Sequence, residues 1–291
     1  MEIAHWYDWR SPTGSDTSGQ RVYFGHETCQ QLLPTPGAAR ELARRLRDSG
    51  KSVTLVVPYL TEAGLRDSVR LIEGLLTQDA SLEVVSSDWG LLHEIGRRGL
   101  GSPVVGRLLS GQLTDPRLAR IMDVNRRRQP RPVRHLDGTV CQLQYIPPSL
   151  AMANRIRSCG LDRPEIIGFL KALGIRRCEL SNISQGMELA SIPGWSYSLH
   201  IPDVLITVMR RCPGSGEDFA SAEHRCTDKV TPSCHGEPRA WEMPGINATV
   251  FRRDNALYYR QPNLPTNLQQ LPIDRLVHRI GRQRDHDSIN R

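Results

Sequence analysis

The sequence predicts an α/β fold of the TIM-like (β/α) barrel type, complete or distorted, with a cysteine-bearing C-terminal elaboration. Candidate strands and helices alternate about every 25 to 30 residues, which is the repeating unit of a parallel sheet or barrel. About seven such units fit a barrel of this length better than a sandwich. An open doubly wound sheet is the alternative fold. No Gly-x-Gly-x-x-Gly follows the first strand, which argues against a dinucleotide site.

The first half of the chain alternates regularly. Continuous apolar runs, of the kind buried parallel strands show, and apolar stripes at helical spacing follow one another. We expect strands at 3–9, 22–25, 53–57, 82–85 and from 104, and helices at 37–49, 61–76, 91–98 and 115–123. Gly50 is suited to end the first helix, because glycine accepts the left-handed conformation that closes many helices.

The second half continues the pattern and then changes. We expect strands at 142–145 and 175–180, a helix at 163–173, and an apolar stretch at 197–208 interrupted by Pro202. The segment from Cys212 is polar, and residues 249–259 suggest a hairpin that turns at Asp254. With neither a repeat nor a separate linker, the chain is expected to form one barrel domain, 1–291, with an elaboration at 212–260.

The charge and composition limit the class of protein. The net charge is +7, and nearly all the basic residues are arginines. Arginines gather at 126–134 and at 275–284, where they could meet RNA or an acidic partner, although GC-rich codon usage also enriches arginine. With no run of 18 apolar residues and no signal-peptide pattern at the start, we expect a cytoplasmic protein without a transmembrane segment.

The cysteines are the main anomaly, because seven is an odd number and a disulfide framework is not expected inside a cell. Cys212, Cys226 and Cys234 lie in a polar loop that can bury little apolar surface. A bound zinc ion or iron–sulfur cluster would order such a loop, although three incidental thiols are the alternative. Either metal centre needs a fourth ligand.

Candidates for that fourth ligand are His224, His235 and the remote Cys29. Cys29 follows the strand at 22–25, so a parallel barrel would place it at the face where active sites are built. The remaining cysteines lie beside apolar runs and are interpreted as small core residues: Cys141, Cys159 and Cys178.

Several segments resemble the collagenase-like peptidase U-32 family, most closely its short UbiU/UbiV-type members. The similar segments cover most of the chain: Tyr23–Cys29, Lys51–Leu60, Leu82–Gly90, Gly174–Ser181 and the Arg-Cys pair at 211–212. The chain departs from the family where Asn182 and Ile183 follow the conserved Leu-Ser, and where Pro202 and Asp203 replace Gly-His. It therefore resembles a divergent member.

The resemblance implies a barrel-like fold and a [4Fe-4S] cluster held by one early and three late cysteines, which match Cys29, Cys212, Cys226 and Cys234. It implies a subunit of an oxygen-independent hydroxylase acting on an aromatic or quinone precursor, as in ubiquinone biosynthesis. A UbiU-like protein partner in a heterodimer and prephenate as oxygen donor follow from the same resemblance. The alternatives are a tRNA or rRNA hydroxylation factor and a non-catalytic barrel stapled by zinc.

Four further residues are candidates for chemistry at the barrel mouth. His26 and Glu27 stand beside Cys29 and could act as acid and base, or could form a surface turn. Asp88 ends a strand on the same face, and Arg107 could bind a donor carboxylate or simply be solvated. Neither His-Glu-x-x-His nor Gly-x-Ser-x-Gly occurs, so the sequence does not support peptidase activity.

Overall fold

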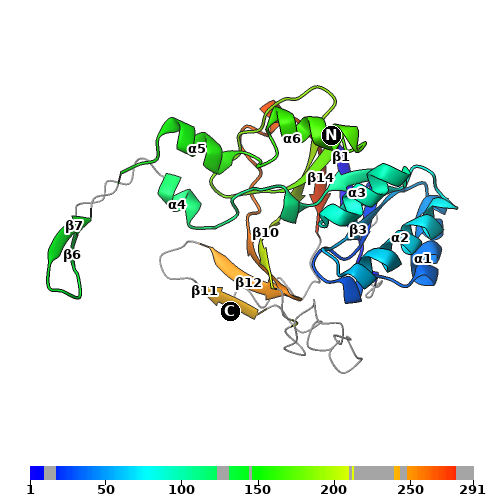
Figure 1. The fold of residues 1–291 in the computed structure, drawn as a ribbon, viewed down its shortest axis with the longest axis horizontal. Coiled ribbons are helices and arrows are strands. Elements are labelled where there is room, and N and C mark those ends of the chain that lie inside the picture. Colours follow the sequence, from blue (N-terminus) through cyan, green and yellow to red (C-terminus); the bar gives the residue numbers. More distant parts are fainter. Residues whose placement is uncertain are drawn as a thin grey trace.

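The computed structural model describes residues 1–9, 18–122, 131–143, 146–209, 212, 239–242 and 248–279. Its centre is a closed barrel of parallel strands, which confirms the predicted α/β barrel (Figure 1). The strands run around the barrel in the order β1, β14, β9, β8, β5, β4, β3, β2. Their bounds are β1 (Glu2–Trp6), β2 (Arg21–Gly25), β3 (Ser52–Val57), β4 (Glu83–Ser86), β5 (Ser102–Val105), β8 (Arg177–Ser181), β9 (Ser196–Ile201) and β14 (Ile273–His278).

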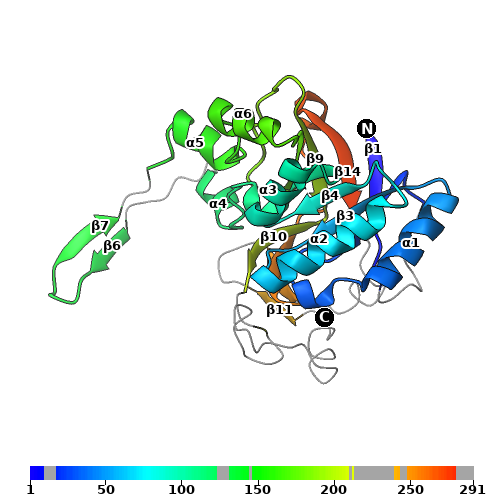
Figure 2. The ribbon, with the colours of Figure 1, turned by 45° about the vertical axis from the view of Figure 1, so that its right-hand side comes forward.

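Helices cover one side of the barrel, as the apolar stripes predict (Figure 2). They are α1 (Pro36–Asp48), α2 (Glu62–Leu76), α3 (Trp89–Arg98) and α6 (Pro164–Ala172). Thr35, Thr61 and Asp88 cap the first three with side-chain oxygens, which satisfy amide groups that a helix start leaves without partners. Their buried leucines and isoleucines pack on the outward-facing side chains of β2, β3 and β4.

The barrel is irregular between β5 and β9, where strands and helices no longer alternate one for one. β5 and β8 share a single residue pair, Val105 with Cys178, while neighbouring strands pair over several residues. Before α6, the connection from β5 to β8 contains η2 (Arg107–Leu109), α4 (Leu118–Met122), β6 (Arg131–Arg134), β7 (Val140–Leu143) and α5 (Leu150–Arg157). In the described residues, no helix lies between β8 and β9. The distorted form of the barrel is therefore the one observed.

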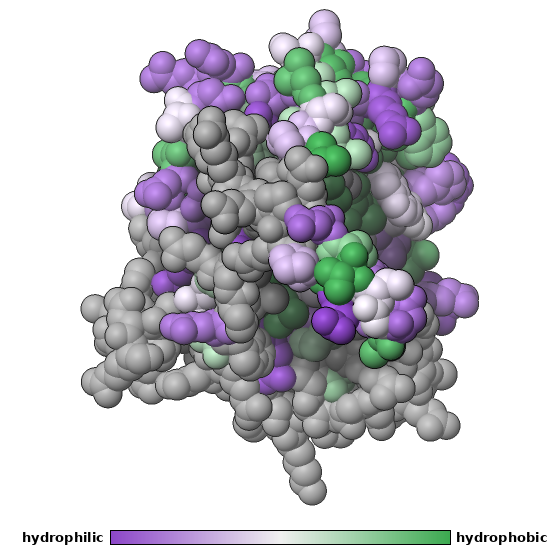
Figure 3. Space-filling model, turned by 90° about the vertical axis from the view of Figure 1, so that its left-hand side faces the viewer, coloured by the Kyte–Doolittle hydropathy of each residue, from purple (hydrophilic) through white to green (hydrophobic). Residues whose placement is uncertain are grey.

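Strands β6 and β7 form an antiparallel hairpin that projects far from the barrel (Figures 1 and 2). Leu136 and Val140 on it are exposed, as are Ile146 and Leu150 nearby. The face toward this hairpin mixes hydrophilic and hydrophobic residues (Figure 3). Most of the predicted arginine cluster at 126–134 lies outside the described residues, but the Arg134 side chain is exposed.

The cysteine-bearing elaboration is an insertion between the last two barrel strands. The chain leaves β9 at Ile201 and, after Pro202, enters an antiparallel sheet of order β10 (Asp203–Val208), β13 (Ala256–Arg260), β12 (Thr249–Arg253), β11 (Arg239–Glu242). β12 and β13 confirm the predicted hairpin, and Asp254 takes a positive φ of 53° in its turn. After η3 (Leu268–Gln270) the chain returns through β14, which closes the barrel beside β1.

The barrel interior combines an apolar layer with buried charges. Trp6, Tyr23, Val56, Val85 and Val104 belong to one buried cluster inside the strands. Charged side chains lie in the same interior, among them Glu83, Glu179 and Arg275. Separately, no helix among the described residues is long and apolar enough to cross a membrane.

Candidate functional site

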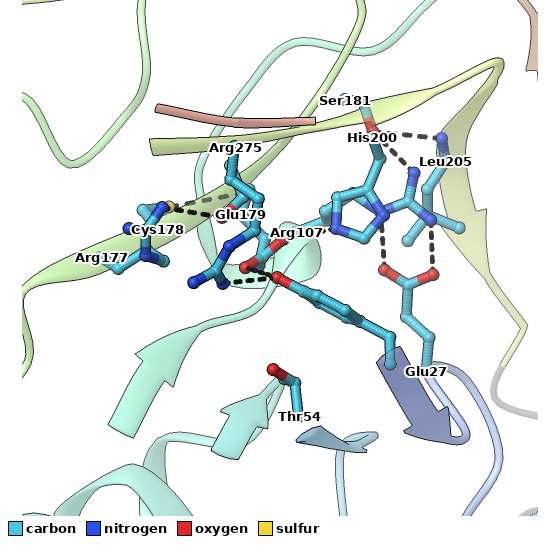
Figure 4. A network of polar contacts seen from close by, with 12 residues as sticks. Glu27, Thr54, Arg107, Arg177, Cys178, Glu179, Ser181, His200, Leu205 and Arg275 are labelled. Carbon is cyan, nitrogen blue, oxygen red and sulfur yellow. Dashed lines mark hydrogen bonds and ion pairs between the residues drawn. The ribbon is translucent and has the colours of Figure 1, made fainter. Parts of the chain in front are cut away.

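A buried ion pair lies where the barrel strands end. Glu27 follows β2, and Arg107 follows β5. Nε and Nη2 of Arg107 donate to the two carboxylate oxygens of Glu27 at 2.6 and 2.5 Å (Figure 4). Both side chains are at most 4% exposed. The structure thus brings together two of the four predicted site residues, in the two-pronged geometry that makes arginine–carboxylate pairs strong.

The remaining donors of Arg107 are also engaged. Its Nη1 donates to the hydroxyl of Ser181 at 3.2 Å and to the backbone carbonyl of Asp203 at 2.8 Å. Burial alone would raise the pKa of Glu27, but the charge and hydrogen bonds of Arg107 outweigh it and lower that pKa to about 2. Glu27 is therefore ionised at neutral pH, and in this structure its carboxylate takes the place expected for a donor carboxylate on Arg107.

His26 shapes the loop that carries Cys29. Its Nδ1 accepts the backbone N–H groups of Cys29 at 3.0 Å and of Thr28 at 3.3 Å. Its Nε2 lies 3.2 Å from a carboxylate oxygen of Asp254 in the β12–β13 turn. With Nδ1 accepting, Nε2 carries the hydrogen and donates to Asp254. His26 thus holds the mouth loop against the inserted sheet, and it is buried rather than part of a surface turn.

Asp88 has a structural role. One of its carboxylate oxygens accepts the backbone N–H of Leu91 at 2.9 Å, which caps α3. The other accepts the backbone N–H of Leu60 at 3.0 Å. These bonds join the start of α3 to the loop after β3, and they account for both oxygens of this candidate catalytic residue.

Cys29 and Cys212 come together although they are far apart in the sequence. Both belong to one small buried cluster with Leu32, against which Tyr59 packs. Cys29 is 7% exposed and Cys212 is 3% exposed. Cys226 and Cys234 lie outside the described residues, and among the described residues no three His, Cys, Asp or Glu side chains are placed to hold a metal ion.

Asn255 ties the two cysteine-bearing segments together. Its side-chain amide donates to the carbonyl of Thr28 at 2.8 Å and to the carbonyl of Met209 at 3.3 Å. Thr28 precedes Cys29 directly, and Met209 lies shortly before Cys212. The backbone N–H of Met209 donates in return to the carbonyl of Asn255 at 2.7 Å. In the sequence Asn255 is only a turn residue, because nothing local shows that its turn folds against the loop after β2.

Two of the three cysteines interpreted as core residues are buried, and the third is not. Cys159 is 2% exposed and Cys178 is fully buried, which confirms the prediction for both. Cys141 lies exposed on β7, beside His135, so the core assignment is wrong there. The apolar residues flanking Cys141 belong to a projecting hairpin, not to the barrel.

A second polar network runs inside the barrel and joins side chains from strands that are distant in the sequence. Tyr23 donates its hydroxyl to one oxygen of Glu179 at 3.0 Å, and Nε2 of His200 lies 2.5 Å from the other oxygen. Arg275 donates to the Tyr23 hydroxyl at 2.8 Å and to Glu83 at 2.6 Å. The sequence signal for Glu179 is a carboxylate that alternates with apolar Cys178 and Leu180 in a buried strand.

Arg275 does not belong to a surface cluster. It is 3% exposed and also forms an ion pair with Glu2 at 2.5 Å, inside the barrel. The expectation that Arg275 belongs to an exposed arginine cluster at 275–284, free to meet RNA or a partner, is therefore wrong for this residue. Arg279 lies with its guanidinium 4.9 Å from the centre of the Trp6 ring, and Arg282 and Arg284 are outside the described residues.

Comparisons with protein-family models, with curated proteins and with solved structures found no match for this chain.

Proposed function

We propose that the protein is an iron–sulfur protein that takes part in oxygen-independent hydroxylation of an aromatic or quinone precursor. The observation that supports this most is the burial of Cys29 and Cys212 in one cluster at the barrel mouth. Cys29 follows a barrel strand and Cys212 follows the inserted strand β10, so two thiols from separate elements meet at one place. The resemblance supplies the class of cluster and of reaction.

The two cysteines that the structure describes at the mouth, Cys29 and Cys212, are compatible with ligands of a metal cluster. No disulfide forms at Cys29 or Cys212 in the structure, and both thiols are shielded from solvent. Cys226 and Cys234 follow Cys212 in the sequence and would complete a set of four thiolates. A bound [4Fe-4S] cluster would supply one-electron transfer at this position.

Charged side chains that bond to one another line the barrel mouth beside those thiols. The Glu27–Arg107 pair joins the loops after β2 and β5, and its bond to Asp203 extends the network to the inserted sheet. Burial raises the pKa of Tyr258 to about 12, so its hydroxyl stays protonated beside these charges.

Purification without oxygen tests the proposal. We expect a brown protein with iron and acid-labile sulfide and with little zinc, measured by elemental analysis and visible absorption. A colourless protein with stoichiometric zinc would contradict it and favour the zinc-stapled barrel. A UbiU-like partner and prephenate are part of the same proposal, and co-expression with such a partner should raise the iron recovered per chain.

A further inference from the structure

The interior network fixes the position of one histidine at the barrel mouth. His200 is the penultimate residue of β9 and lies beside Ser181 of β8 and Val277 of β14 in the barrel register. It is 4% exposed. Figure 4 shows its ring between Glu179 and the Arg107–Glu27 pair. His200 therefore lies inside the barrel, next to the end where the loops carry the candidate site.

The hydrogen bonds determine which ring nitrogen carries the hydrogen. Arg275 can only donate, so the Tyr23 hydroxyl accepts from Arg275 and gives its own hydrogen to Glu179. Burial alone would raise the pKa of Glu179, but the hydrogen bond and charge of His200 and the charges of nearby arginines outweigh burial and lower that pKa. The Glu179 carboxylate is therefore ionised and accepts hydrogen bonds at both oxygens. Nε2 of His200 must then be the donor in its bond to Glu179.

The other nitrogen of His200 is left as a base. Burial, and then the charge of Arg107, lower the pKa of His200, so the ring is neutral at neutral pH. With its hydrogen on Nε2, a neutral ring has a lone pair on Nδ1. Among the described residues, no hydrogen bond reaches that atom. The arrangement is a carboxylate–histidine pair, in which the carboxylate orients the ring and stabilises the imidazolium that forms when a proton arrives.

Trp6 adds an independent sign of a ligand at this end. It is the last residue of β1 and belongs to the interior cluster with Tyr23. Its indole nitrogen is buried and lacks a hydrogen-bond partner in the described part of the chain. A buried donor without a partner is costly, and a ligand oxygen would satisfy it.

We propose that His200 is the proton acceptor of the barrel mouth and that it takes the proton of a phenol hydroxyl, with Glu179 as its positioning residue. The choice of an aromatic substrate rests on the proposed function. In the step, the phenol O–H bond breaks, the electron pair stays on oxygen, and an N–H bond forms at Nδ1. A carboxylic acid would need no such base at neutral pH, because it is already ionised.

The charges around His200 suit this transfer. Arg107 lies close enough to lower the pKa of the ring, and its positive charge would also favour a phenolate. Glu179 faces the ring from β8, Tyr23 from β2, and Glu27 from the loop after β2. Because a neutral imidazole with a lowered pKa is a weak base, it should deprotonate phenols whose own pKa is low, and ring substituents provide such phenols.

A series of fluorophenols of decreasing pKa tests the proposal in the full-length protein. The ¹⁹F chemical shift of the bound probe reports whether it is phenol or phenolate. In the unmodified protein we expect the probe's pKa to fall on binding by about 1 unit. In His200→Gln, where Arg107 remains but the base is absent, the pKa of the bound probe should fall clearly less. His93→Gln, on the exposed face of α3, is the matched control and should behave as the unmodified protein does.

Glu179→Gln should bind the probe and lower its pKa less than the unmodified protein does, because the imidazolium loses its counter-charge. If that variant fails to fold, Tyr23→Phe is the second variant. It removes the hydroxyl that donates to Glu179 and accepts from Arg275, and it should also lower the pKa of the bound probe less than the unmodified protein does. The same protonation state in the unmodified protein and His200→Gln, or no binding of any probe, would overturn the proposal. Iron content of each sample separates the two proposals, since His200→Gln should keep its iron.

Discussion

Glu27 and Arg107, separated by 80 positions in the sequence, form a two-pronged ion pair at the mouth of the barrel. The pair joins the loop after β2, which carries Cys29, to the loop after β5. Because both side chains are almost completely buried, neither can be removed alone without leaving a charge in a poorly solvated place. The order of the mouth therefore depends on both partners.

Removal of one partner should be strongly destabilising. We expect Glu27→Gln to lower the free energy of unfolding by about 3–5 kcal/mol, because it leaves the Arg107 charge buried without a counter-charge. Urea unfolding followed by circular dichroism measures this. The double variant Glu27→Gln with Arg107→Gln should recover part of the loss. Glu41→Gln, which breaks an exposed pair with Arg44 on α1, should change stability little.

Arg275 should matter for folding and not for RNA binding. Arg275→Gln removes the most buried arginine that pairs with Glu83 and Glu2, which keep only the less buried Arg21 and, for Glu83, Arg177. We expect the free energy of unfolding to fall by about 3 kcal/mol. Arg134→Gln, on the exposed hairpin, is the matched control and should leave stability unchanged. If the folded Arg275 variant lost salt-dependent RNA binding that the Arg134 variant retained, the interior assignment of Arg275 would be wrong.

Stability should fall as the pH drops below 6.5, the ordinary pKa of histidine. The folded chain holds the pKa of His200 below that value, so the unfolded chain binds more protons in this range. The stabilisation from a neutral His200 is complete above 6.5 and is lost as the pH falls through the folded-state pKa. The urea concentration at the unfolding midpoint, measured at about pH 7.5 and about pH 5, should fall less with pH in His200→Gln than in the unmodified protein. Equal slopes would contradict the buried neutral ring.

Asn255 should help to hold Cys29 and Cys212 in place without being a metal ligand itself. Asn255→Ala removes the bonds to the carbonyls of Thr28 and Met209, each buried bond being worth about 1 kcal/mol. We expect lower stability and a lower yield of iron per chain after anaerobic purification. Asn267→Ala, which loses a bond to the Met187 carbonyl and contacts neither cysteine-bearing segment through it, is the control and should keep its iron. Full iron content in Asn255→Ala would show that this contact does not organise the site.

The barrel could be predicted because its strands and helices each bury a continuous local pattern. Tyr23, Glu179 and Arg275 could not be placed, because a barrel interior combines residues from distant strands, and no local pattern shows which partner will neutralise a buried charge. Arg275 in particular lies in an arginine-rich stretch that resembles a solvated surface until β14 pairs with β1. Likewise, Cys29 was placed at the mouth from strand order, whereas the contact through Asn255 required the folded insertion.

Iron per chain in two single-cysteine variants tests the central claim most directly. Cys29→Ala removes a thiol of the mouth cluster, and Cys178→Ala removes a buried thiol of the barrel core. After anaerobic purification, we expect Cys178→Ala to retain the iron and brown colour of the unmodified protein, and Cys29→Ala to lose them. Full iron in Cys29→Ala, or equal loss in both variants, would contradict a cluster held at the barrel mouth.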